Sequence, residues 1–364
     1  MKTKIFLFFI VTSIFYSCHI GRFFYYNFAD IRDHKKFPRR DLINDGNTFH
    51  FAESAIPLAP KTIEIKNKKQ PFEEFLDETN TVAFLIIRND TILYEKYLDD
   101  YKPSSIVPSF SMAKSVTSML IGCAIDDGLI NSVEDKMTDY LPELKSKGMD
   151  DVTIEHLLQM TSGIAFDEKY ISPFSDAALF YYGRNLRKYV SNMKPETEPG
   201  IDFHYTSGST QLLGNILEIA LKGKTITSYF QEKIWSPLGM EYNGSWSIDK
   251  KNDGLEKTFC CLNARARDFA KLGRLYLKKG NWNGQQIISE QWVHDSTHPS
   301  QRAGGVSYYQ YQWWIPAEGD FMAAGILGQY IYVHPKTNTI IVRLGRNEGS
   351  VNWWGILPSI ASYY

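Results

Sequence analysis

The sequence predicts a mixed α/β protein: an antiparallel sheet flanked by N- and C-terminal helices, with an inserted all-α part. Two hairpins, at residues 81–101 and 325–345, have the β-branched and aromatic content of sheet strands. Between them, apolar residues recur at helical spacing. Because strands occupy both ends of this region and helices its middle, the two hairpins are expected to meet in one sheet.

Turn and end signals define the individual elements. A helix-like stretch at 69–80 precedes the first hairpin, which turns at Asn89-Asp90. The second hairpin turns at 335–338, and 352–364 is expected to form a closing helix, weakened by Pro358. The middle helices are expected within 115–130, 153–164, 209–224 and 266–284, and three of them stop at Gly128, Gly163 and Gly223.

The N-terminal residues 1–18 have the pattern of an export signal. Lys2 and Lys4 precede an apolar run that is short for a membrane span, and Ser17-Cys18 resembles a lipoprotein cleavage site. A lipid on Cys18 would tether the protein to a membrane surface; plain secretion and an uncleaved anchor are the alternatives. The protein is therefore expected to be exported, either periplasmic or membrane-tethered.

The rest of the chain is expected to hold one domain. Residues 19–60 are polar and are predicted to be an irregular approach segment. This domain is expected at 61–364, with an α/β part at about 61–110 and 262–364 and a helical part at about 111–261.

Composition excludes several classes of function. The 364 residues are 43% apolar and 22% charged, with a net charge of -1, so no basic surface for nucleic acid is expected. No His, Asp or Glu cluster has zinc-ligand spacing, and no glycine-rich phosphate loop follows a strand, so neither a metal nor a cofactor is predicted. Cys123, Cys260 and Cys261 are expected to be small buried thiols.

Ser111 and Lys114 stand three residues apart at the start of a long predicted helix. Positions i and i+3 lie on one helix face, so the lysine can reach the serine. A serine hydroxyl needs a base to act as a nucleophile, and a lysine serves as that base only if burial lowers its pKa. A serine three residues before a lysine occurs often by chance. The residues around this pair must therefore show whether it is an active site or an ordinary helix start.

Two further stretches could complete a site. Tyr205 and Ser207 precede a helix, where a tyrosine can pass a proton to a leaving group; alternatively they are an interface aromatic and a helix cap. Gly325 and Gly328 interrupt a strand, which usually means that another group approaches the backbone closely. The N–H of Ile326 could then pair with that of Ser111 to bind an oxyanion.

In order and spacing, these elements resemble the serine β-lactamase and penicillin-binding-protein superfamily, with its S-x-x-K, Y-x-N and K-T-G motifs. The likeness covers nearly the whole chain past residue 75, including "SMAKSVTSMLIGCAIDDGLI", "HYTSGSTQLLGNILE" and "ARDFAKLGRLYLKKGNWNGQQII". Within the class C-like branch of esterases, D-amino-acid-peptide hydrolases and amidases, it is most similar to the 6-aminohexanoate-dimer hydrolases. The resemblance implies a β-lactamase/transpeptidase-like fold.

The resemblance also implies roles for single residues. Ser111 would be acylated, Lys114 would be its base and Tyr205 would relay a proton to the leaving group. Tyr170, Ser207, Gly325 and Gln329 would lie against the substrate, with Ser207 standing where many relatives have Asn.

The third motif departs from the family pattern. It aligns with Ala323-Ala324-Gly325 and lacks the cationic residue that helps to hold a β-lactam carboxylate. The predicted function is therefore a serine hydrolase that cleaves a small amide or ester through an acyl-enzyme. The alternative is a penicillin-recognising protein: a β-lactamase, a D-Ala carboxypeptidase, or a sensor that acylates without turnover.

Overall fold

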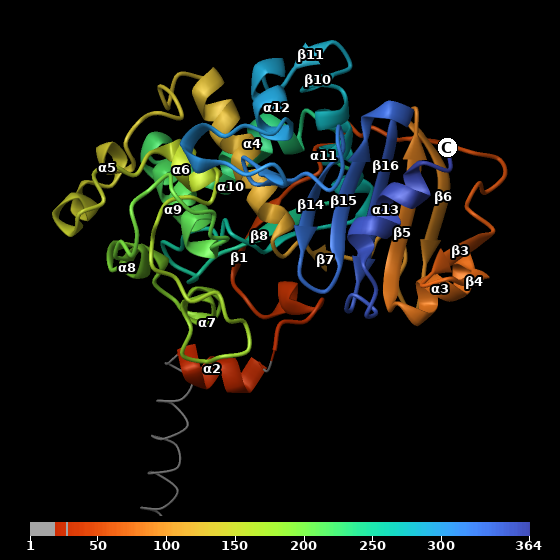
Figure 1. The fold of residues 1–364 in the computed structure, drawn as a ribbon, viewed down its shortest axis with the longest axis horizontal. Coiled ribbons are helices and arrows are strands. Elements are labelled where there is room, and N and C mark those ends of the chain that lie inside the picture. Colours follow the sequence, from red (N-terminus) through yellow and green to blue (C-terminus); the bar gives the residue numbers. More distant parts are fainter. Residues whose placement is uncertain (1–18, 27) are drawn as a thin grey trace, which may run out of the picture.

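The computed structural model describes residues 19–26 and 28–364, and its largest sheet has eight strands (Figure 1). Neighbours run antiparallel, except that β2 is parallel to β6. The two predicted hairpins, β5–β6 and β15–β16, meet where β16 pairs with β5, which confirms the predicted fold class. The spatial order is β12 (Tyr309–Gln310), β13 (Trp313–Trp314), β14 (Phe321–Gly325), β15 (Gln329–His334), β16 (Thr339–Gly345), β5 (Thr81–Arg88), β6 (Thr91–Tyr97) and β2 (Ala52–Glu53).

The central strands are buried on both faces. Phe84 and Ile86 of β5 pack with helices α3 (Phe72–Glu78) and α13 (Trp353–Ala361). Leu85 and Ile87 pack with the larger core, to which α11 (Ala266–Leu277) belongs. Successive side chains of a strand point to opposite faces. Burial on both faces therefore explains why β5 is a continuous apolar run rather than an alternating one.

The helical region contains two long helices, α4 (Met112–Asp126) and α9 (Ser207–Ala220), which pack against each other (Figure 1). Gly128 and Gly223, just beyond their ends, have φ of +69° and +99°, the left-handed conformation that glycine adopts without strain. The shorter elements here are α5 (Met137–Tyr140), η2 (Pro142–Lys147), α6 (Ile154–Leu158), α7 (Asp176–Tyr182), α8 (Leu186–Ser191), α10 (Ile226–Phe230) and η3 (Gln231–Trp235).

The N-terminal segment is more ordered than the sequence predicts. Residues 19–60, expected to be irregular, contain helix α2 (His19–Tyr26), β1 and β2, and α2 lies beside α7 (Figure 1). Phe23 of α2 is buried with its ring 5.4 Å from that of Tyr182. This packing, which local polarity does not reveal, orders the segment. A second sheet has the order β1 (Arg39–Leu42), β8 (Gly244–Ser247), β9 (Leu262–Ala264) and β7 (Val107–Pro108).

The remaining elements lie outside the site. They are η1 (Asp33–Lys35), β3 (Thr62–Ile65), β4 (Lys68–Pro71), β10 (Asn281–Trp282), β11 (Gln285–Gln286), α12 (Glu290–Thr297), η4 (Arg302–Gly304) and η5 (Pro335–Thr337). The predicted export signal, with Cys18, lies outside the described residues. Within the part that is described, no helix is both long and apolar enough to cross a membrane.

Arg343 of β16 fixes the turn between β14 and β15. Its guanidinium is fully buried, stacks on the Trp353 ring at 4.1 Å and donates to the carbonyl oxygens of Gly328, Thr79 and Asn347. A Cβ at Gly328 would lie 1.9 Å from this guanidinium, so Arg343 is the group that approaches that glycine. The close approach predicted at Gly328 is thus confirmed.

Arg343→Met is expected to destabilise the fold by about 3 kcal/mol or more, since buried carbonyl oxygens left without donors cost about 1–3 kcal/mol each. The free energy of unfolding from urea denaturation measures this loss. Arg346→Met is the matched control: Arg346 pairs with Asp99 at a partly exposed position, so its loss should cost at most about 1 kcal/mol. Equal effects of the two substitutions would contradict the assigned role of Arg343.

Candidate active site

Ser111 stands at the N-terminus of α4, where the two preceding residues, Ser109 and Phe110, fix its position. Ser109 donates its N–H to the Leu262 carbonyl at 2.7 Å, and its Oγ accepts the Leu262 N–H at 3.1 Å. Phe110 has φ of +44°, an unusual conformation for a bulky residue, and it reverses the chain into the helix. The turn is therefore fixed by β9, and Ser111 remains only partly buried.

Lys114 lies one helical turn further on, as the i+3 spacing predicts. Its Nζ is 3.1 Å from Ser111 Oγ, 3.0 Å from Ser207 Oγ and 2.9 Å from the Phe259 carbonyl oxygen. The side chain is fully buried, and this burial lowers its pKa to about 8, although the charge of Glu168 opposes the shift. At neutral pH an appreciable fraction of Lys114 is therefore an uncharged amine beside the serine.

Ser207 connects Lys114 to a carboxylate that the sequence reasoning missed. Ser207 donates its Oγ hydrogen to Glu168 at 2.6 Å and its N–H to the same carboxylate at 2.7 Å. Tyr170 also donates its hydroxyl to Glu168, at 2.6 Å. Glu168 stands two residues before Tyr170 in a stretch without regular structure. The only sign of Glu168 in the sequence is its position close to Tyr170. No local sequence pattern predicts its contact with Ser207.

Tyr205 lies beside both Lys114 and Ser111. Its ring stacks on Trp314 with 5.4 Å between centroids, and Lys114 Nζ lies 5.1 Å from the centre of the same ring. Burial, and then the charge of Glu168, raise the pKa of Tyr205, while an interaction with the Ser111 hydroxyl opposes them. Tyr205 therefore keeps its proton at neutral pH and can donate it.

The end of β14 closes the other side of the site. A Cβ at Gly325 would lie 2.5 Å from the Ser109 carbonyl oxygen and 3.1 Å from the Ser111 nitrogen, so the close approach predicted at this glycine is confirmed. Ile326 follows directly and borders the same space as Ser111. The predicted substrate contact Gln329 is placed differently, because its side chain is fully buried and its amide bonds to the backbone of Gly345. Its side chain therefore holds the turn and has no surface for a ligand.

Two cavities meet at Ser111, and Tyr170 and Ile326 border both of them. The first, of about 200 Å³, extends from Ser111 toward α7 and the chain after α2. The second, of about 170 Å³, runs along β14 and is bordered by Tyr205 and Trp314. Among the residues that the structure describes, no group of three or more His, Cys, Asp or Glu side chains could hold a metal ion.

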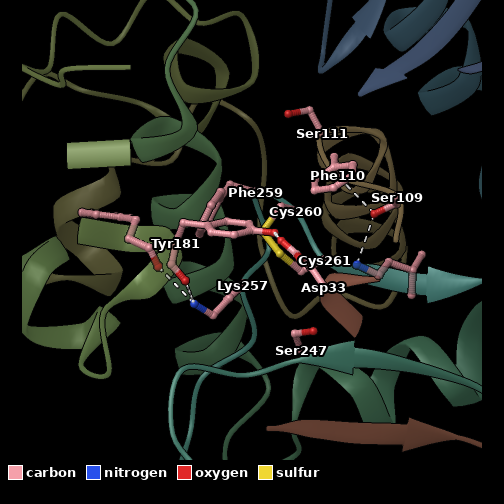
Figure 2. The surroundings of a disulfide bond; sticks show 12 residues. Asp33, Ser109, Phe110, Ser111, Tyr181, Ser247, Lys257, Phe259, Cys260 and Cys261 are labelled. Atoms are coloured by element: carbon pink, nitrogen blue, oxygen red, sulfur yellow. Dashed lines mark hydrogen bonds between the residues drawn. A yellow bond between two sulfur atoms is a disulfide. The ribbon is translucent and has the colours of Figure 1, made fainter. Parts of the chain in front are cut away.

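Cys260 and Cys261 form a disulfide, so the expectation of two buried thiols at these positions is wrong (Figure 2). Cys123 is a buried free thiol, as expected. Figure 2 shows the disulfide between the chain that leads into α4 and the loop that carries Lys257. Adjacent cysteines can bond only when the fold brings their sulfur atoms together, which the sequence pattern does not reveal.

The disulfide adjoins the hydrogen bond that holds Lys114. Phe259, whose carbonyl accepts from Lys114, directly precedes Cys260, and the Cys261 carbonyl accepts from the Ser247 N–H at 3.0 Å. Trp246 donates its indole N–H to the Cys260 carbonyl at 3.0 Å. The disulfide therefore restrains the peptide groups between Lys114 and β8.

Reduction of this disulfide is expected to slow modification of Ser111 by a fluorophosphonate about tenfold, because small misplacements of a catalytic group cost rate steeply. The intact mass before and after a phosphine reductant reports the gain of two hydrogen atoms, and mass spectrometry times the adduct. Cys123→Ser is the control and should respond like the unmodified protein. An unchanged rate after complete reduction would contradict a positioning role for the disulfide.

Comparison with known proteins identifies the family of this chain. The model of the family described as Beta-lactamase matches residues 69–351. A 6-aminohexanoate-dimer hydrolase of Paenarthrobacter ureafaciens is 25% identical over 313 residues, 79% of either chain. AmpH, a D-alanyl-D-alanine-carboxypeptidase/endopeptidase of Escherichia coli K12, is 22% identical over 271 residues, covering 70% of this chain and 68% of that one.

Solved structures give the same result. A Bacillus anthracis protein provisionally named a 6-aminohexanoate-dimer hydrolase superposes with a TM-score of 0.81 at 26% identity, covering 92% of both chains. A family VIII carboxylesterase has a TM-score of 0.63 at 17% identity over 80% of this chain and 94% of its own, which shows the shared fold. With a family model that spans most of its length, the chain belongs to the Beta-lactamase family, within the superfamily of serine β-lactamases and penicillin-binding proteins.

Proposed function

We propose that this protein is a serine hydrolase that cleaves an amide or ester bond through an acyl-enzyme on Ser111. The observation that carries the proposal is the fully buried Lys114 amine, 3.1 Å from Ser111 Oγ, whose pKa burial lowers to about 8. A lysine in solution would be almost entirely protonated at neutral pH and could not accept the serine proton. Hydrolase names among the relatives support the same reaction class.

In the first step, the neutral Lys114 amine accepts the Ser111 proton as Oγ attacks the substrate carbonyl. The negative charge that develops on the carbonyl oxygen is held by the N–H groups of Ser111 and Ile326, which lie on the two sides of the contact between α4 and β14. Backbone donors of this kind contribute about 3–4 kcal/mol each to the barrier reduction.

In the second step, Tyr205 gives its proton to the leaving amine or alcohol, and Lys114 returns a proton to Tyr205. Both groups adjoin Ser111: Lys114 Nζ is 3.1 Å from Ser111 Oγ, and the Tyr205 hydroxyl interacts with the Ser111 side chain. A water molecule then attacks the acyl-enzyme, with Lys114 and Tyr205 serving as its base. Tyr170 and Ser207, both donors to Glu168, border the first cavity and supply polar contacts to the substrate.

β-Lactam hydrolysis is the weaker candidate. Ala323, which aligns with the cationic residue of the third motif, is a buried alanine, and the next residue, Ala324, borders the second cavity with only a methyl group. Among the described residues that border either cavity, none is a lysine or an arginine. A substrate that relies on its own carboxylate for binding therefore has no cationic partner among these residues.

The reaction is expected to accelerate with rising pH through a midpoint near pH 8, because only neutral Lys114 is a base and its pKa is lowered to about 8. Below that midpoint the rate should fall about tenfold per pH unit. The pH profile of kcat/KM for an uncharged ester measures this. A rate that is flat between about pH 6 and pH 9 would contradict Lys114 as the base.

Glu168→Gln is expected to move that midpoint to lower pH. The carboxylate raises the Lys114 pKa through its charge, so its removal leaves burial less opposed. The amide can still hydrogen bond to Ser207, so the geometry is largely kept. An upward shift of the midpoint would contradict the electrostatic role of Glu168.

Ser111→Ala is expected to remove about 10³-fold or more of the activity toward all substrates. Tyr205→Phe should cost about 10²–10⁴-fold on amides and alkyl esters, but much less on p-nitrophenyl esters, whose leaving group needs no proton. A panel of p-nitrophenyl and alkyl esters, D-alanyl peptides, an aminohexanoate dimer and nitrocefin measures both effects. Ester turnover with weak or absent nitrocefin turnover is expected.

Two outcomes of this panel would count against the proposal. Equal losses on activated and unactivated esters in Tyr205→Phe would remove Tyr205 as the acid. A penicillin adduct on Ser111 that persists without turnover would favour the sensor alternative instead.

A further inference from the structure

The two cavities beside Ser111 differ in the residues that border them. The first is walled by apolar groups, among them Phe28, Ala178, Phe259, the Cys260 side of the disulfide and Leu327. The described residues that border it include no Asp, Glu, Lys, Arg or His. Its polar residues include Ser111 and, beside it, Ser207 and Tyr170, which both donate to Glu168.

The second cavity contains the proton donor. Tyr205 borders this cavity and does not border the first. If Tyr205 protonates the leaving group, that group must lie beside the Tyr205 hydroxyl and so in the second cavity. The acyl part of the substrate, on the other side of the scissile bond, is then directed into the first cavity.

Resting on the proposed function, we infer that the first cavity is an acyl-binding site that selects small, uncharged, apolar acyl groups. An ammonium or carboxylate at the far end of the acyl chain would lose its water there and find no charged partner, which is costly. At about 200 Å³ the cavity is smaller than the roughly 300–1,000 Å³ usual for drug-sized ligands, so a short or medium chain fits best.

The part of the cavity wall away from Ser111 comes from segments with no role in the proposed chemistry. Phe28 and Ala29 belong to the N-terminal segment, which α2 fixes against α7. Tyr181 from α7 also borders the cavity, but its hydroxyl donates to Asp33 at 2.6 Å and is already engaged. The N-terminal segment and α7 thus contribute to acyl selectivity without taking part in the proposed chemistry.

The test compares phenyl esters of butanoate, hexanoate and 6-aminohexanoate. Each methylene buried in the cavity should raise kcat/KM up to about fourfold, so hexanoate should exceed butanoate by about tenfold. The protonated 6-aminohexanoate ester, which has the same chain with a terminal charge, should be slower than hexanoate by about tenfold or more.

A charge placed at the cavity mouth should change this preference. Ile171 borders the cavity with 78% of its surface exposed, so Ile171→Asp should fold normally. The new carboxylate is expected to shift the ratio of 6-aminohexanoate to hexanoate turnover about fivefold toward the charged ester, the effect of an exposed ion pair. Phe174→Asp is the matched control: Phe174 is 79% exposed on the same loop but does not border the cavity, so the ratio should stay unchanged.

A second pair of substrates tests which side of the bond the cavity serves. Acetylcholine and the acetate of its uncharged isostere 3,3-dimethylbutanol differ only in the charge of the leaving group. Ile171→Asp should leave their ratio unchanged if the first cavity holds the acyl part. A shift in this ratio, without one in the acyl series, would overturn the assignment.

Failure of this inference can be told apart from failure of the proposed function. A fluorophosphonate adduct on Ser111 and ester turnover that do not depend on acyl length or charge would overturn the acyl-site assignment alone. The absence of both the adduct and turnover would overturn the proposed function, and the acyl-site assignment with it.

Discussion

The site depends on one constraint, the burial of the Lys114 amine among neutral oxygen atoms. Its direct partners are two hydroxyls and a backbone carbonyl, and the nearest carboxylate, Glu168, is reached only through Ser207. A carboxylate in direct contact would stabilise the ammonium and keep the lysine charged. With no carboxylate nearby, burial would lower the pKa further. The interposed Ser207 therefore sets the balance that brings the Lys114 pKa to about 8.

This burial requires several distant segments to converge on one helix end. The α4 N-terminus is bonded to β9 through Ser109, approached by β14 at Gly325, and covered by the Phe259 carbonyl. Arg343 holds the turn after β14, and the Cys260–Cys261 disulfide adjoins the Phe259 carbonyl. Because these supports come from both sheets, the helical part cannot form the site alone. The chemistry therefore requires the α/β part and the inserted helices to fold as one unit.

The sequence predicts those features that local spacing determines. The Ser111–Lys114 pair follows from helix geometry, the hairpins from strand composition, and the close approach at Gly325 from a glycine inside a strand. Glu168, the disulfide and the order of the N-terminal segment were missed. Glu168 and the N-terminal segment depend on contacts between residues far apart in the chain, such as Ser207 with Glu168 or Phe23 with Tyr182, whereas the disulfide joins adjacent residues and depends on the conformation of the chain at that point. No local period or spacing records a contact of this kind.

The choice of substrate is constrained by the same low polarity that makes Lys114 a base. A substrate whose own charge lay close to Lys114 would move its pKa, since an opposite charge raises it and a like charge lowers it. Within the described part of the chain, the first cavity beside Ser111 has no charged residue on its walls, and no lysine or arginine borders the second, so neither wall adds a positive charge near the amine. A carboxylate-bearing substrate such as a β-lactam would bring an anion near Lys114 and stabilise its ammonium form. An uncharged acyl group leaves the pKa of Lys114 unchanged. This is a physical reason for an apolar acyl site to accompany a buried lysine base.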